Sequence, residues 1–185
     1  MQPQTPGCNQ WADTWASQVA AFKPDVSIIL IGRWEIVNRE LDSKWSHIGR
    51  PNFDKQLIGE LRRAIEVASG SPATGQDNQL GPTKVVVLTM PYLGPDPNPL
   101  TGRPFPETLH MRVDMFNKLE YSLAQMFPRQ VSVFDLGSII SPGGHFSGYL
   151  GNQTVKWPDG VHVTQATGFE ISGMLFSTLS HLTGL

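Results

Sequence analysis

Three short apolar segments, at 25–31, 84–90 and 130–136, constrain the fold of this 185-residue chain more than any other feature of its sequence. The first is apolar on both sets of alternating positions, which is typical of a strand buried on both faces of a parallel sheet. The stretches between the segments carry apolar residues at helical spacing, which indicates helices that cover the sheet. This order predicts an α/β fold, a three-layer α/β/α sandwich with a mostly parallel sheet.

Four amphipathic segments are predicted to form the helices. The first follows Asn9 and ends at Pro24, the second spans 53–69, the third spans about 107–127, and the last runs from Thr164 to about His181. Asn9, Asn52 and Thr164 are the expected N-caps, because their side-chain oxygens can accept from free N–H groups of the first turn.

Long irregular loops are predicted for 33–52, 91–106 and 137–161. The chain contains 18 glycines and 15 prolines, which favour such loops over further regular structure. All three loops begin where a predicted strand ends, and ligands of parallel sheets gather at the carboxyl ends of the strands. We therefore expect any functional site at this edge of the sheet.

The composition predicts one folded domain over 1–185 and excludes some partners. Hydrophobic residues make up 39% of the chain and charged residues 16%, and the formal net charge is −2. The absence of a basic surplus argues against nucleic acid and anionic membranes as partners. No signal-peptide pattern begins the sequence, and no apolar run is long enough to span a bilayer. The single cysteine, Cys8, cannot form an internal disulfide, so it does not indicate a compartment.

The segment Trp-Pro-Asp-Gly-Val-His, just before the last predicted helix, contains the best candidates for catalytic residues, Asp159 and His162. A carboxylate three residues before a histidine, on a turn, can bind the imidazole Nδ1. That contact fixes the tautomer and leaves Nε2 free to act as a general base. The alternative reading is an aspartate that caps the helix beside a hydrogen-bonded histidine.

A second candidate segment, Gly32-Arg33-Trp34-Glu35, directly follows the first predicted strand. Gly32 lets the backbone turn sharply, so that its amide or a neighbouring one can point into a site as an oxyanion donor. Arg33 and Glu35 either pair with each other, bind substrate or face solvent. Trp34 either packs in the core or offers a flat face to a sugar.

Taken in order, these segments resemble the SGNH (GDSL-like) hydrolase superfamily. The resemblance is carried by the strand that ends in Gly-Arg-Trp-Glu, by Val-Val-Val-Leu-Thr-Met-Pro, by the 112–117 helix segment, by Val-Phe-Asp-Leu and by Trp-Pro-Asp-Gly-Val-His-Val-Thr. It extends from about Cys8 to the end and is most specific at Asp159 and His162. The chain is most similar to SGNH domains fused C-terminally to bacterial membrane O-acyltransferases, especially those of actinobacteria.

The resemblance implies a serine esterase or O-acyltransferase of SGNH/flavodoxin-like architecture that acts on an acylated carbohydrate or cell-envelope molecule without a cofactor. By the match, His162 is the general base and Asp159 orients it. Gly32 begins a block that usually reads Gly-x-Asn-Asp, so Trp34 stands where the oxyanion-hole asparagine is expected, and Arg33 is the candidate substitute. The relatives are membrane-anchored with this domain outside the cytoplasm, so membrane association is expected only through an upstream domain.

The family's nucleophile, the serine of a Gly-Asp-Ser block after its first strand, has no counterpart in this chain. The first strands of the family fold are therefore expected to be missing, as in a fragment or one half of an assembly. The segment Val26–Ile31 would then form a bare strand edge that pairs with an upstream segment or with a second copy. Ser46, Ser141 and Ser147 are local candidates, but none lies on a strand-to-helix elbow.

The same residues admit two further interpretations. A zinc ion held by His145, Asp159 and His162 fits no closed ligand spacing, so no metal is expected. A catalytically degenerate module is the main rival to an enzyme, and it would bind glycan or a partner protein through Trp34, Trp45 and Trp157. The missing serine keeps this rival open.

Overall fold

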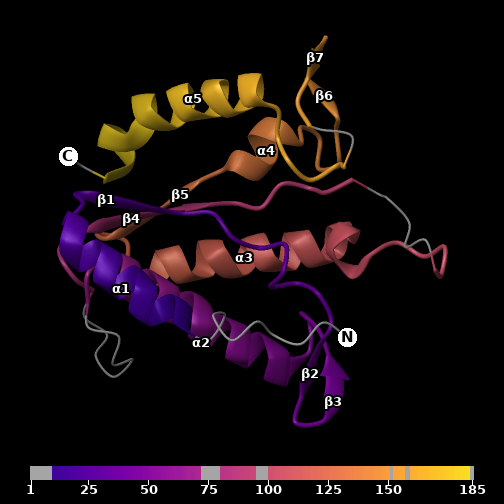
Figure 1. Ribbon diagram of the computed structural model, residues 1–185, viewed down its shortest axis with the longest axis horizontal. Coiled ribbons are helices and arrows are strands. Elements are labelled where there is room, and N and C mark those ends of the chain that lie inside the picture. The colour runs from indigo at the N-terminus through magenta and orange to yellow at the C-terminus, as the bar shows by residue number, and fades with distance from the viewer. Residues whose placement is uncertain (1–9, 72–79, 95–99, 151, 157–158, 184–185) are drawn as a thin grey trace.

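The structure is a computed structural model in which the sheet lies between two layers of helices (Figure 1). Cys8, Asn9 and Trp157 lie outside the described part of the chain. The described residues are 10–71, 80–94, 100–150, 152–156 and 159–183.

The expected helices and strands occur in the expected order, and two hairpins, a short α-helix and a 3₁₀ turn are added to them. The helices are α1 (Trp11–Phe22), α2 (Pro51–Ala68), α3 (His110–Met126), α4 (Leu136–Ile140) and α5 (Gln165–Thr183), with a short 3₁₀ turn at Pro106–Thr108. The strands are β1 (Val26–Ile29), β2 (Arg39–Leu41), β3 (Lys44–Ser46), β4 (Lys84–Leu88), β5 (Val131–Phe134), β6 (Tyr149–Leu150) and β7 (Gln153–Thr154).

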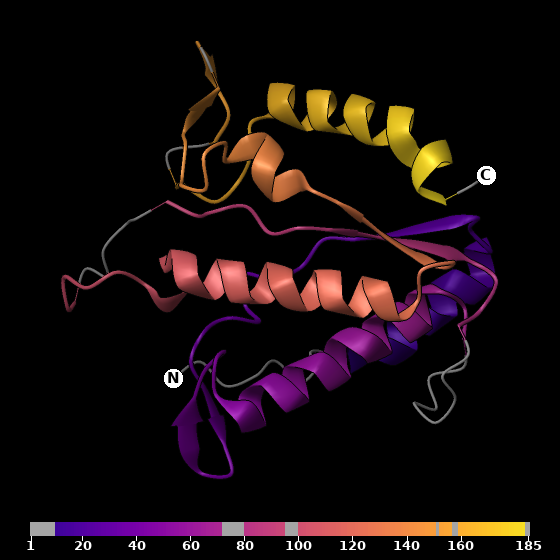
Figure 2. The same cartoon turned by 180° about the vertical axis from the view of Figure 1, so that it is seen from behind.

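The central sheet has the order β1-β4-β5, and both strand pairs are parallel. Helices α1, α2 and α3 cover one face, whereas α4 and α5 cover the other, as the two opposite views agree (Figures 1 and 2). The predicted α/β/α sandwich with a parallel sheet is therefore confirmed. No helix in the described residues combines the length and apolar character needed to cross a membrane.

Alternating residues of β4 divide the core into two halves. Val85 and Val87 pack with the residues of α2 and α3, whereas Val86 and Leu88 pack with those of α4 and α5. All four side chains are at most 5% exposed. A strand that buries both sets of alternating side chains must lie between two helical layers, which is the reason for the three-layer architecture.

Two segments predicted as plain loops contain regular structure, so those predictions were wrong. Residues 33–52 contain the β2–β3 hairpin, whose turn is made by Asp42 and Ser43, both with positive φ (50° and 61°). Asp-Ser is a weaker signal for such a turn than Asp-Gly, so the pattern was not recognised. Residues 137–161 contain most of α4 and the β6–β7 hairpin. Figure 1 shows the two hairpins on opposite sides of the sheet.

The helix caps agree only in part with the prediction. Thr164 caps α5, since its Oγ1 accepts from the Thr167 N–H at 3.3 Å. Asn52 is not a cap: α2 begins at Pro51, two residues earlier than predicted, and Arg50 is the N-cap. Proline is well suited to the first helical position because it needs no N–H partner there. The predicted cap Asn9 lies outside the described residues.

Among the described strands, β1 lies at the edge of the sheet. Lys84 donates its N–H to the carbonyl of Asp25 at 3.0 Å, which starts the parallel ladder with β4. Backbone groups alternate in direction along a strand, so those of Ile28 and Leu30 point away from β4. Their side chains are 44% and 56% exposed. No other strand among the described residues pairs with this outer side of β1.

Candidate active site

Asp159 and His162 lie close together on the turn before α5. The His162 Nδ1 is 2.6 Å from Asp159 Oδ2. Asp159 Oδ1 accepts two backbone N–H groups, from Val161 at 2.9 Å and from His162 at 3.0 Å. Because both carboxylate oxygens are bonded within the turn, the carboxylate is held against the imidazole by local geometry alone.

This arrangement keeps Asp159 ionised. The hydrogen bond from His162, followed by the two backbone hydrogen bonds, lowers the pKa of Asp159 to about 2. With Nδ1 engaged by the carboxylate, the proton-accepting position of a neutral His162 is Nε2. The His162 side chain is 72% exposed, and no described residue is hydrogen bonded to Nε2. The pair can therefore take a proton from a group that approaches from outside the turn.

A second loop supports the turn from outside. Gly94, near the start of the loop after β4, donates its N–H to the carbonyl of Gly160 at 2.8 Å. A Cβ added at Gly94 would lie 2.7 Å from the Gly160 Cα, so neither position has room for a side chain. Gly160 also has a positive φ of 66°, which glycine adopts without strain. The two backbones touch because both residues are glycine.

Lys156 ties the same two loops together. Its ammonium donates to the carbonyl of Tyr92 and lies 4.9 Å from the ring centre of Phe146. The side chain is only 3% exposed, and this burial lowers the pKa of Lys156 to about 8, against the opposing effect of the Asp159 charge. Sequence reasoning did not identify Lys156, Tyr92 or Gly94. The one available signal was a lysine between the apolar Val155 and the candidate motif.

The Gly32 amide is engaged in this structure. It donates to Oε2 of Glu35 at 2.8 Å, and the Glu35 N–H returns a bond to the Gly32 carbonyl at 3.1 Å. Gly32 has a φ of 140°, and a Cβ there would lie 2.7 Å from the Met90 sulfur, so only glycine fits. An oxyanion can use the amide only if the Glu35 carboxylate moves aside.

Arg33 and Trp34 do not pair with Glu35. Arg33 forms an ion pair with Glu107 at 3.8 Å, and its guanidinium carbon lies 4.7 Å from the centre of the Trp34 ring. The buried Nε of Arg33 has no hydrogen-bond partner among the described residues. Trp34 is 61% exposed, so it belongs to the surface and not to the core.

Helix α3 anchors the 32–36 segment and the end of β4. Arg112 is buried and donates to the carbonyl of Ile36 at 2.8 Å. The side-chain amide of Asn117 accepts from the Met90 N–H and donates to the Met90 carbonyl, both at 2.9 Å. These contacts hold the 32–36 segment and the chain just after β4 in place. No hydrogen bond or ion pair between described residues joins the 32–35 segment to Asp159 or His162.

The candidate serines occupy three different settings. Ser46 ends β3. Ser147 donates its hydroxyl to the carbonyl of Tyr149. Ser141 is 1% exposed, and its Oγ has no partner among the described residues. None of the three is hydrogen bonded to His162 in the described part of the chain.

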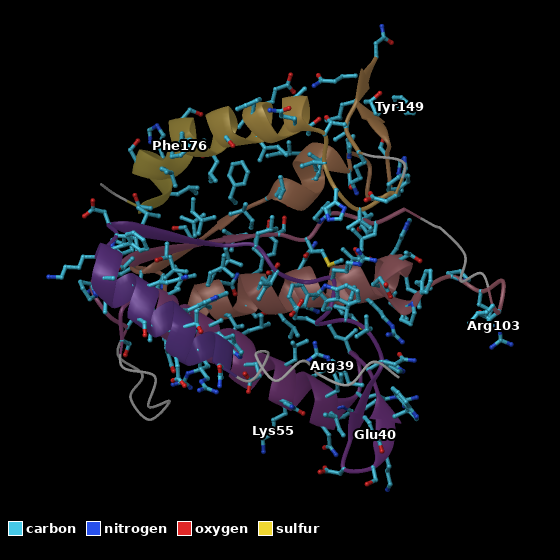
Figure 3. The ribbon with its side chains drawn as sticks, viewed as in Figure 1. Arg39, Glu40, Lys55, Arg103, Tyr149 and Phe176 are labelled. Carbon is cyan, nitrogen blue, oxygen red and sulfur yellow. The ribbon has the colours of Figure 1, made fainter. Side chains whose placement is uncertain are left out.

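The described residues contain no group of three or more histidine, cysteine, aspartate or glutamate side chains that could hold a metal ion. His145 instead places its Nδ1 3.1 Å from the carbonyl of Gly143. Of the other candidate tryptophans, Trp45 is 62% exposed on the β2–β3 hairpin. It lies opposite Glu40 in that hairpin, and Figure 3 shows Glu40 at the periphery of the molecule. Trp157 lies outside the described residues.

Comparisons with known proteins identify the fold. No family model matches the chain, and no curated protein matches its sequence significantly. Among solved structures, the chain is similar to Est24, a carbohydrate acetylesterase from Sinorhizobium meliloti, with a TM-score of 0.58 and 20% sequence identity. The match covers 92% of this chain and 67% of that chain. At this identity the likeness establishes a shared SGNH-type fold and nothing more.

Proposed function

We propose that this SGNH-type domain acts on ester bonds of an acylated carbohydrate, as a serine esterase or O-acyltransferase whose general base is His162 and whose orienting carboxylate is Asp159. The observation that carries the proposal is the 2.6 Å contact between His162 Nδ1 and Asp159 Oδ2. The similarity to a carbohydrate acetylesterase supports a hydrolase on an acylated sugar. The choice between water and a second hydroxyl as the acyl acceptor separates esterase from acyltransferase.

The proposed chemistry is acyl transfer in two steps. His162 Nε2 takes the proton of a serine hydroxyl while the serine oxygen bonds to the ester carbonyl carbon. The carbon–oxygen bond to the leaving alcohol then breaks, and His162 returns the proton to that alcohol. In the second step His162 takes a proton from water or another hydroxyl, whose oxygen bonds to the acyl carbon. The bond from that carbon to the serine oxygen then breaks, and His162 returns the proton to the serine. Asp159 stabilises the imidazolium that forms in each step.

Gly32 and Arg33 are the proposed donors to the oxyanion, with Trp34 and Glu35 beside them. The Gly32 amide is available once Glu35 turns away, and the guanidinium of Arg33 lies in the same segment. A donor that reaches the oxyanion contributes strongly to acyl transfer, since one such donor accounts for about a 100-fold change in rate. The attacking serine is not assigned to a residue of this chain.

Reaction of the purified chain with a fluorophosphonate probe, followed by mapping of the modified residue, tests the proposal. If the chain holds a complete site, one serine is labelled in the folded protein and His162→Ala abolishes the labelling. His181→Ala is the matched control, because His181 lies in the last turn of α5 and outside the proposed site. A folded chain that takes up no label would overturn a complete catalytic site in this chain.

A glycan-binding module without catalysis is the second candidate function, and the exposure of Trp34 favours it. The residue is 61% exposed beside the guanidinium of Arg33, an arrangement that can stack against a sugar ring. This function requires saturable binding of glycan without hydrolysis and loss of that binding in Trp34→Ala. Absence of binding across a panel of envelope glycans would exclude it.

A further inference from the structure

A small polar cavity lies where β4 and β5 end, apart from the residues assigned to catalysis. Its volume is about 100 Å³. Tyr92 forms one wall, Asp135 and Ser138 form the wall at the start of α4, and Ser141 closes the end of that helix. Such crevices at the carboxyl ends of parallel strands are the usual ligand sites of α/β sheets.

Ser141 is the anomalous residue of this cavity. The side chain is 1% exposed, yet its hydroxyl has no hydrogen-bond partner among the described residues. Buried hydroxyl groups in folded proteins almost always have a partner, so an orphan hydroxyl beside a cavity indicates that a bound molecule supplies one. Rotation about the Cα–Cβ bond moves the hydroxyl between staggered positions and lets it reach such a molecule.

Asp135 determines which kind of ligand the cavity favours, by its negative charge. Burial opposes its ionisation, but hydrogen bonds from Ser138 and from Thr89 hold the pKa of Asp135 below its usual value. Those bonds are 2.7 Å from the Ser138 hydroxyl and 2.9 Å from the Thr89 hydroxyl. No described lysine, arginine or histidine forms an ion pair with this carboxylate. The site therefore repels anions and favours a ligand rich in hydrogen-bond donors.

Tyr92 forms an aromatic wall of the cavity and connects the cavity to the Asp159–His162 turn. Its hydroxyl donates to Asp114, which raises the pKa of Tyr92 to about 12 and leaves the phenolic oxygen free to accept. Its carbonyl accepts from Lys156, and two residues later Gly94 contacts Gly160 of that turn. A molecule in the cavity would therefore lie next to the loop that holds the Asp159–His162 turn.

We propose that this cavity binds the hydroxyl groups of a sugar ring, with Ser141 and Asp135 as the residues that recognise them. Sugar hydroxyls both donate and accept, which matches an orphan hydroxyl, a carboxylate that has no ion pair among the described residues, and a phenolic oxygen. The aromatic ring of Tyr92 suits the apolar face of a sugar. The choice of a sugar over other polyols rests on the proposed function, and the cavity then holds the carbohydrate part of the ester substrate.

Titration of the folded chain with glucose and with N-acetylglucosamine, followed by NMR of the Gly143 and Gly144 amides, tests this inference. We expect saturable shifts, and we expect Ser141→Ala to weaken binding about fivefold, as loss of one hydrogen bond does. Without sugar, Ser141→Ala should melt at the same or a higher temperature, since it removes an unpartnered hydroxyl. Ser177→Ala is the control, because its hydroxyl is bonded within α5, to the Met174 carbonyl, and lies outside the cavity.

Three results would overturn the inference: no shift with either sugar, unchanged binding in Ser141→Ala, or glycerol binding as tightly as the sugars. None of these titrations involves an ester. A negative sugar titration therefore does not contradict the catalytic proposal, and a negative fluorophosphonate test does not contradict the sugar site.

Discussion

The backbone N–H of Gly32 donates to the carboxylate of Glu35, with 2.8 Å between the nitrogen and Oε2. The amide proposed to stabilise an oxyanion is thus engaged by an acid of its own loop. If Gly32 serves catalysis, removal of that acid frees the donor.

We therefore expect Glu35→Ala to raise the rate of fluorophosphonate labelling, by up to about 100-fold if the amide is a full oxyanion donor. Glu35→Gln is the matched control, because the amide oxygen of glutamine can still accept from Gly32. Labelling rates at a series of probe concentrations measure the effect. A slower reaction in Glu35→Ala would show that the hydrogen bond supports the loop and that Gly32 is not an oxyanion donor here.

Asp159 is expected to titrate near pH 2, because the hydrogen bonds from His162 and from the Val161 and His162 amides stabilise its charged form. A lowered folded-state pKa stabilises the fold at pH above the unfolded value, and this contribution is lost as the pH falls toward 2. Carbon-13 NMR of the side-chain carboxyl measures the midpoint. His162→Ala should raise it, since the largest cause is removed, and an unchanged midpoint would contradict the assignment of the pair.

Glu120 on α3 is 2% exposed, and both of its carboxyl oxygens lack a partner among the described residues. Burial, with a smaller effect of the Glu35 charge, raises the pKa of Glu120 to about 9. The folded protein therefore keeps a proton that the unfolded chain loses above about pH 4.5. The free energy of unfolding should fall as the pH rises from about 4.5 to 9 and then level off.

Glu120→Leu should be more stable than the parent at pH 7 and should lose this pH dependence. Glu120→Gln should lose the pH dependence but remain less stable than the leucine variant, because its amide is also buried without a partner. Urea unfolding at several pH values provides the measurement, with the exposed Glu60→Leu as control. Equal pH profiles for the parent and Glu120→Leu would contradict the raised pKa.

The outer edge of β1 is expected to pair with a second copy of the chain. Ile28→Lys should weaken this association, because a charge on an edge strand opposes pairing. Sedimentation velocity over a range of concentrations tests the prediction, with Ile58→Lys on α2 as the control. A parent chain that stays monomeric throughout would refute it.

Local sequence determined the strands, most of the helices and the Asp159–His162 pair. Val85–Leu88 is apolar at every position, so both of its faces must be covered whatever the rest of the chain does. Asp159 and His162 are three residues apart, so a single turn brings the carboxylate to the imidazole. The surroundings of the candidate serines and the β2–β3 hairpin could not be predicted from the sequence, because no strong turn or elbow signal marks them.

Tertiary structure alone decided what surrounds that pair. Gly94 and Gly160 are 66 residues apart, and Lys156 reaches Tyr92 across 64, yet these contacts hold the Asp159–His162 turn. The burial of Glu120 and the orphan hydroxyl of Ser141 likewise arise only when α3, α4 and the sheet pack together. Periodicity and short spacing report interactions within one element, whereas contacts between distant loops depend on how the layers pack, which no local pattern encodes.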